Sequence, residues 1–109
     1  MAKTLIILST AEKAKLLTGL MYAINAARNG WLDEVRVVFF GPAEGLLADD
    51  AEVAETALAL PDSAQPTACR AVADREGLAA AIENRGIPLE NVGPPISQMI
   101  NAGWVPLVF

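Results

Sequence analysis

The sequence contains no histidine, and it has only one cysteine among its 109 residues. Histidine is the usual general base near neutral pH and the commonest metal ligand. Its absence excludes Ser-His-Asp and Cys-His catalysis and most zinc sites. A single cysteine cannot form an internal disulfide, and no C-x-x-C pair is available for dithiol exchange. We therefore expect neither a metal nor a cofactor, and a free thiol is typical of a reducing cytoplasm.

Basic residues and long apolar runs are also scarce. Lysine and arginine number 8 against 13 acidic residues, which gives a formal net charge of −5. This charge argues against a nucleic acid or an acidic membrane surface as a partner, because both require a basic field. No run of about 18 apolar residues exists to span a bilayer. The apolar run at 5–8 is too short for a signal peptide, so we expect a cytoplasmic protein.

What the chain does have is apolar character, with 53% hydrophobic residues and 19% charged ones. A chain of this length forms one domain, spanning 1–109. Such a composition in a small domain favours a homo-oligomer, in which part of the apolar surface is buried between subunits. The alternative is a monomer whose many alanines raise the hydrophobic fraction while burying little area. Trp31 and Trp104 are candidates for an interface.

Five apolar stretches have the length and the β-branched or aromatic character of strands. Four helical patterns lie between them, and this alternation predicts an α/β fold. We expect a three-layer α/β/α domain with a five-stranded, mainly parallel sheet. Pro106 cannot donate to a ladder, so the last strand should lie at an edge. The predicted strands are 5–8, 34–40, 67–69, 87–92 and 104–109.

The helix starts carry recognisable signals. Ser9 with Glu12 and Asp49 with Glu52 both match a capping box. In the helix that starts at 93–95, three apolar residues should form a buried face. The segment from Glu44 to Asp62 is wholly acidic, which is typical of a solvated helix surface. The apolar residues in question are Ile96, Met99 and Ile100.

The carboxyl ends of parallel strands share one edge of the sheet, and ligands collect there. The residues that follow the predicted strands would therefore form a candidate binding site for a small anion near helix N-termini. No G-x-G-x-x-G or G-x-x-x-x-G-K-[ST] motif is present. For Ser9 and Thr10 the alternative is a role in helix capping. The candidate binding residues are Ser9, Thr10, Gly41, Arg70 and Gly93.

Cys69 ends the third predicted strand, and its thiol is the most distinctive candidate for chemistry in the chain. Two interpretations remain open. A free cysteine is commonly a small buried hydrophobe. Alternatively, a following helix N-terminus and the neighbouring Arg70 would favour the thiolate and make Cys69 a nucleophile.

The chain resembles the DsrE/DsrF-like family, which has the YchN-like fold. The features that carry the resemblance extend over nearly the whole length and are moderately specific. They are the opening strand, the Val-Val-Phe-Phe-Gly strand end at 37–41, Ala-Cys-Arg at 68–70, Gly-Ile at 86–87 and the closing Ala-Gly-Trp-Val-Pro-Leu-Val-Phe at 102–109.

The resemblance implies a three-layer α/β/α domain that assembles into trimers or hexamers. It also implies a sulfur-relay role, in which Cys69 accepts persulfide sulfur and passes it to a partner. The lack of a second cysteine would make this chain a carrier that depends on a separate sulfur donor and acceptor protein. The alternative function is a non-catalytic oligomeric module that binds a small anionic ligand at the carboxyl edge of the sheet.

Overall fold

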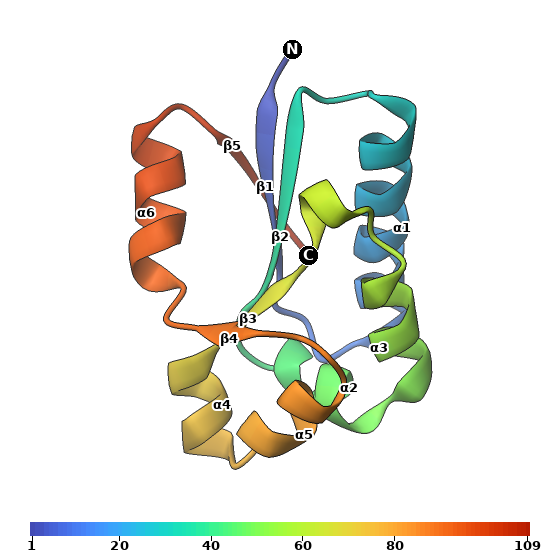
Figure 1. Ribbon diagram of the computed structural model, residues 1–109, viewed down its shortest axis with the longest axis vertical. Helices are drawn as coiled ribbons and strands as arrows, with labels where there is room; N and C mark the ends of the chain where they lie inside the picture. Colours follow the sequence, from blue (N-terminus) through green and yellow to red (C-terminus); the bar gives the residue numbers. More distant parts are fainter.

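A computed structural model describes residues 1–109 and contains one five-stranded sheet (Figure 1). The strand order is β4-β3-β2-β1-β5, and every neighbouring pair is parallel. The expectation of a mainly parallel sheet is confirmed, because no antiparallel pair occurs. The strands are β1 (Lys3–Leu8), β2 (Glu34–Phe39), β3 (Thr67–Cys69), β4 (Leu89–Glu90) and β5 (Val105–Val108).

Helices fill each connection between strands, as right-handed crossovers between parallel strands require. Gly77 separates two short helices, because this glycine adopts a left-handed φ of +71°. The helices are α1 (Lys13–Asn29), α2 (Ala43–Asp49), α3 (Ala51–Leu58), α4 (Arg70–Glu76), α5 (Ala79–Asn84) and α6 (Gly93–Asn101), with a 3-10 turn η1 at Asp62–Ala64.

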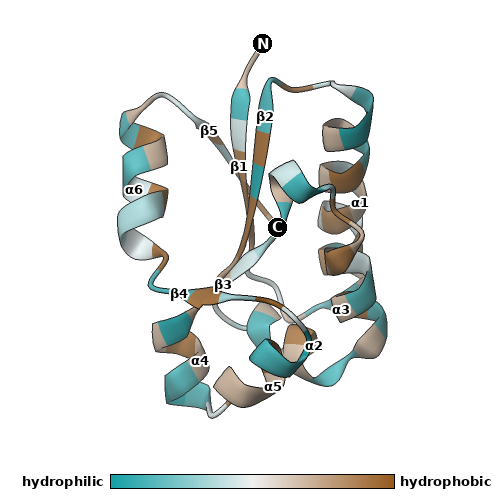
Figure 2. Ribbon diagram, viewed as in Figure 1, coloured by the Kyte–Doolittle hydropathy of each residue, from teal (hydrophilic) through white to brown (hydrophobic).

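The sheet carries a separate apolar core on each of its faces. The larger core joins the alternate strand residues Ile6, Val37 and Phe39 to α1, α2, α3 and α5. The smaller core joins Leu5 and Val38 to α4 and α6. Figure 1 shows α1 and α3 on one side of the sheet and α6 on the other, so the three-layer prediction is confirmed. Figure 2 shows the strongly hydrophobic residues concentrated along the central strands and α1.

Helix α6 is less buried than its sequence pattern predicts. No residue of α6 is fully buried. Ile96 and Met99 pack against the smaller core, but Ile100 is 47% exposed. The predicted buried face of this helix is therefore wrong at Ile100. The smaller core has only five buried members, so it offers α6 less apolar surface than the larger core offers α1.

Strand β5 lies at the edge of the sheet, as Pro106 predicted. Phe109 N donates to Ile7 O of β1 at 2.8 Å. Because successive backbone N–H groups point to opposite sides of a strand, position 106 would direct its N–H away from β1. Proline therefore removes no ladder hydrogen bond there, and it blocks this edge against a further strand.

The predicted capping box at Ser9 does not form, because the N-cap of α1 is Glu12 and no side chain caps this helix, and the predicted cap of α3 is displaced by one residue. The amide of Glu12 donates to Thr10 Oγ1, not to Ser9, and α1 begins at Lys13. Helix α3 is capped by Asp50, whose carboxylate accepts from Val53 N at 3.2 Å. The reason is that each helix starts one or more residues later than its sequence signal indicates.

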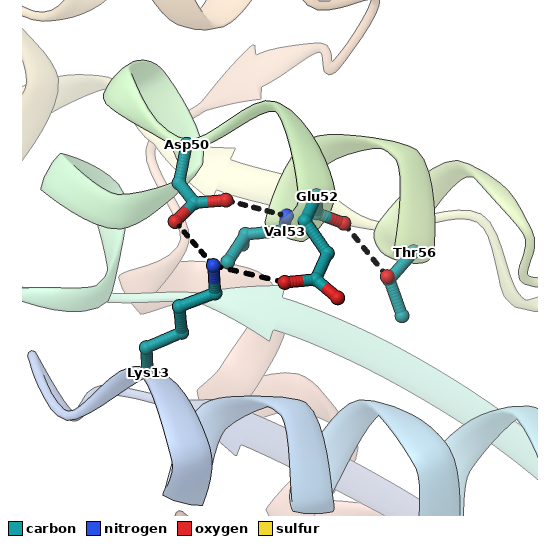
Figure 3. A network of polar contacts seen from close by, with 5 residues as sticks. All are labelled: Lys13, Asp50, Glu52, Val53 and Thr56. Atoms are coloured by element: carbon teal, nitrogen blue, oxygen red, sulfur yellow. Dashed lines mark hydrogen bonds and ion pairs between the residues drawn. The ribbon is translucent and has the colours of Figure 1, made fainter.

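One polar network joins the starts of two helices that pack on the same face (Figure 3). Lys13, the first residue of α1, places its Nζ 2.9 Å from Asp50 Oδ2 and 2.9 Å from Glu52 Oε1. Hydrogen bonds with Glu52 and Asp50 raise the pKa of Lys13, and the bond with Lys13 lowers the pKa of Asp50. Asp50 thus caps α3 and ties it to α1.

Candidate functional site

The carboxyl ends of β1 and β2 lie close together because of Gly41. This glycine has a φ of +102°, which disfavours any other residue. A Cβ there would also lie 3.1 Å from Ser9 Oγ. Phe40 N donates to Leu8 O, and Ala43 N donates to Ser9 O, each at 2.9 Å. The β2–α2 turn is therefore held against the end of β1.

An open cleft of about 400 Å³ lies beside this turn, between the start of α2 and the far end of α4. Figure 1 shows α2, α4 and α5 gathered at the end of the molecule where the strands finish. Arg75 is the only cation in the cleft wall, and Glu76 is the only acid. Seven residues line it: Gly41, Pro42, Gly45, Val72, Arg75, Glu76 and Leu78.

Arg75 is exposed, and its guanidinium is only partly engaged. Its Nε donates to Glu76 Oε1 at 3.2 Å. The guanidinium is thus ion-paired with Glu76, and its two Nη nitrogens make no hydrogen bond with the protein. The planar fork of an arginine can hold a carboxylate or a phosphate through two parallel hydrogen bonds. Arg75 therefore presents free donors at the mouth of the cleft.

Glu44 lies beneath the same turn. The sequence pattern predicts no functional role for it and indicates only that it belongs to a solvated acidic helix surface. That expectation is wrong for this residue, because its exposed fraction is 0%. Its Oε2 accepts from Gly41 N at 3.2 Å, and its Oε1 has no partner. Burial raises the pKa of Glu44 to about 7, partly offset by the Gly41 hydrogen bond and the charge of Arg75.

Cys69 is buried, with 4% of its surface exposed. It sits in the smaller core with Leu5, Val38 and Val92. Val72 belongs to this core and also lines the cleft, whereas Cys69 is not among the lining residues. The structure therefore places Cys69 next to the cleft but not in it.

Arg70, the neighbour of Cys69, does not engage the thiol. Its Nη1 lies 3.9 Å from Asp74 Oδ1, one helical turn along α4, and no hydrogen bond joins it to the sulfur. Of the two features predicted to favour a thiolate, the structure thus shows the strand-to-helix position of Cys69 but no cation held against it.

The remaining predicted binding residues lie apart from the cleft. Ser9 N and Thr10 N both donate to Phe109 O, at 2.7 and 3.1 Å, so these donors are already used. Thr10 Oγ1 accepts from Glu12 N in the turn before α1, but no side chain caps the helix itself, so the capping alternative is also wrong. Gly93 begins α6 beyond β4. Of the residues predicted to bind an anion, Gly41 alone lines the cleft.

Comparisons with known proteins reveal a structural relative. No protein-family model and no curated protein matches the chain. A solved structure of a conserved protein of unknown function from Bacteroides thetaiotaomicron superposes with a TM-score of 0.83. The match covers 98% of this chain and 95% of that one, at 26% sequence identity. The two chains share their fold over nearly the whole length.

None of the helices in the structure is both long enough and apolar enough to cross a membrane. The longest, α1, has 17 residues, and one of its faces packs into the larger core.

Proposed function

We propose that this protein is a non-catalytic binding module that holds a small anionic ligand in the cleft beside Gly41. The single observation that carries the proposal is the pairing of an open cleft with an arginine whose Nη donors are free. The cleft lies at the carboxyl edge of the sheet, where open α/β folds bind their ligands. Arg75 would hold the anion through charge-assisted hydrogen bonds.

The lining of the cleft indicates a binding role rather than covalent chemistry. It contains no serine, threonine, cysteine or lysine, and the one carboxylate that could act as a nucleophile, Glu76, is ion-paired with Arg75. Val72, Leu78 and Pro42 supply apolar surface beside the polar groups. A pocket of this kind suits a ligand with a small apolar body and one charged end. A small organic carboxylate has both features, whereas sulfate has only the charge.

Calorimetric titration with benzoate tests this proposal, with sulfate and neutral benzamide as comparison ligands. Benzoate should bind, sulfate should bind more weakly, and benzamide should not bind. Arg75→Ala should weaken benzoate binding by roughly tenfold or more, the loss expected for a hydrogen bond to a charged group. Arg70→Ala is the matched control, since Arg70 is on the same helix but outside the cleft. Equal losses in both variants, or no benzoate binding, would refute the proposal.

A second candidate function is the sulfur relay implied by the DsrE/DsrF-like resemblance, and membership of that family is likewise a proposal. The supporting observation is the place of Cys69 between β3 and α4, one side chain away from the cleft. The Cys69 thiolate would attack the outer sulfur of a donor persulfide, and the donor thiolate would leave. An acceptor cysteine from another protein would then take the sulfur. This role requires the thiol, which is buried in the smaller core, to become accessible to the donor.

Native thiol reactivity separates the two functions. A carrier must react with a thiol reagent nearly as fast when folded as when unfolded, and a sulfur donor must add the mass of one sulfur atom. Cys69→Ser should abolish that gain. The burial of Cys69 leads us to expect slow native reaction and no added sulfur. Rapid reaction together with sulfur uptake would instead favour the carrier.

We further propose that the protein works in the cytoplasm as a trimer or hexamer. The free thiol supports the location. The assembly is supported by exposed apolar residues, which on the β5 edge strand include Val108, 65% exposed. Because Pro106 blocks the strand edge, subunits would meet through side chains rather than by extending the sheet.

A further inference from the structure

Glu44 lies where its charge can affect ligand binding in the cleft. It lies in the chain between the lining residues Pro42 and Gly45, and its carboxylate hydrogen-bonds the amide of the lining residue Gly41. Helix capping does not by itself explain an acid at this position, since glutamine reaches back to the same amide in capping boxes. Unlike a glutamine amide, a glutamate carboxylate can carry a negative charge. Its second oxygen, Oε1, is buried without a hydrogen-bond partner.

The charged groups around Glu44 come from three neighbouring elements. Across the cleft, α4 contributes Arg75 and Glu76. Just beyond α5, Arg85 is engaged elsewhere, because its Nε donates to Ala48 O at the far end of α2. At the start of α3, Asp50 is paired with Lys13. Arg75 forms its own ion pair with Glu76, and its charge also lowers the pKa of the Glu44 carboxyl.

We propose that Glu44 regulates ligand binding in this cleft by competing with the anion for Arg75. When Glu44 is neutral, Arg75 is free to hold the ligand. When Glu44 is ionised, it attracts the guanidinium and repels the anion, so affinity falls. This inference rests on the proposed binding function and adds pH control to it. Burial places the ionisation of Glu44 near pH 7, well above that of an ordinary carboxyl.

The test is benzoate titration of the intact protein between about pH 5.5 and 8.5, a range in which an ordinary carboxylic acid stays ionised. Wild-type affinity should fall by roughly fivefold or more with rising pH, as expected for coupling between two sites. Glu44→Gln should bind with nearly constant affinity. Glu76→Gln, the matched control in the cleft wall, should keep the pH dependence.

A second measurement uses the wild-type protein alone and does not depend on any variant folding. Because coupling is reciprocal, saturating benzoate should raise the pKa of Glu44, which its carboxyl carbon resonance reports by NMR. Binding that does not vary with pH, or that varies equally in Glu44→Gln, overturns this inference and leaves the binding function intact. No binding at any pH overturns both.

Discussion

Two side chains near the carboxyl edge are buried for different reasons. Cys69 is surrounded by apolar neighbours and behaves as a small hydrophobe in the smaller core. Glu44 is equally buried but is held there by one hydrogen bond, from Gly41 N. Burying a carboxyl without full hydrogen bonding destabilises its charged form. Glu44 therefore stays protonated over a pH range in which the surface carboxylates are ionised.

The raised pKa of Glu44 makes folding stability depend on pH. Its ordinary value is 4.5 and its folded value is about 7, so the folded state holds the proton more tightly. The stabilisation is complete below about pH 4.5 and is lost as pH rises through 7, by on the order of 3 kcal/mol. Glu44→Gln should remove this loss. Denaturant unfolding at the two ends of this pH range measures the change in the free energy of unfolding. If that free energy falls with pH as much in Glu44→Gln as in the wild type, the effect does not come from Glu44.

The sequence could not reveal the burial of Glu44, because the acidic segment that contains it is otherwise solvated. Glu55 and Asp62, in the same segment, are surface residues. A local signal did exist, since Gly41 and Pro42 followed by Glu44 fit the start of a helix with an acid at its third position. Whether such an acid is covered depends on α4 and α5 packing over it, which no local pattern contains.

At the scale of elements, α1 packs unusually closely against the sheet at Gly19. A Cβ on Gly19 would lie 2.8 Å from Leu8 Cδ2 and 2.8 Å from Phe109 Cγ. The glycine thus lets the helix rest on the end of β1 and on the last residue of the chain. Phe109 O in turn accepts from Ser9 N and Thr10 N, which fixes the β1–α1 turn.

Gly19→Val should therefore destabilise the fold by about 1–3 kcal/mol, the usual effect of overpacking a core. Gly45→Ala is the matched control, because nothing lies within 4 Å of a Cβ there. That change should stabilise α2 by about 0.5–1 kcal/mol through helix propensity. Thermal unfolding of both variants checks the pair, and similar effects would mean that close packing at Gly19 is unimportant.

The contact between α1 and α3 depends on Asp50, which both caps α3 and pairs with Lys13. Asp50→Asn should keep the cap and lose the ion pair, whereas Asp50→Ala should lose both and be the less stable. Because the pKa of Asp50 is lowered, its stabilisation is present above pH 3.8 and is lost as pH falls. Acid unfolding of the two variants measures the difference. Equal stability would show that the cap contributes nothing.

The bounds of helices and strands were predicted most accurately where long apolar patterns define them. The strands predicted at 5–8 and 34–40 both appear near their predicted bounds. The strand predicted at 87–92 shrinks to Leu89–Glu90, because only two residues reach a neighbour in register. Helix starts were displaced because several polar residues in a row offer equivalent caps, and tertiary packing selects among them.

At the scale of the whole molecule, the two faces of the sheet are unequally covered. The face toward α1 is closed by four helices, whereas the face toward α6 has a small core and leaves Ile100 and Val108 exposed. Trp31, at the far end of α1, is 54% exposed and lies against Tyr22 with ring centroids 6.3 Å apart. Together these residues are candidates for contacts between subunits.

If the chain assembles as the DsrE/DsrF-like resemblance implies, light scattering should give a mass that is a multiple of three times the 11.5 kDa chain. Trp31→Ser should shift the assembly toward monomer by roughly tenfold or more in dissociation constant if the tryptophan anchors an interface. Circular dichroism of the variant distinguishes dissociation from unfolding. A monomer mass at every concentration would contradict the assembly.

The central claim is that an anion binds in the cleft beside Gly41 and Arg75. Backbone amide NMR during benzoate titration tests it most directly, because the competing positions on the sheet edge give separate signals. If the anion binds there, saturable shifts should appear at Gly41, Gly45 and Val72, together with the Arg75 Nε resonance. Saturable shifts confined instead to Ser9, Thr10 and Gly93 would contradict it.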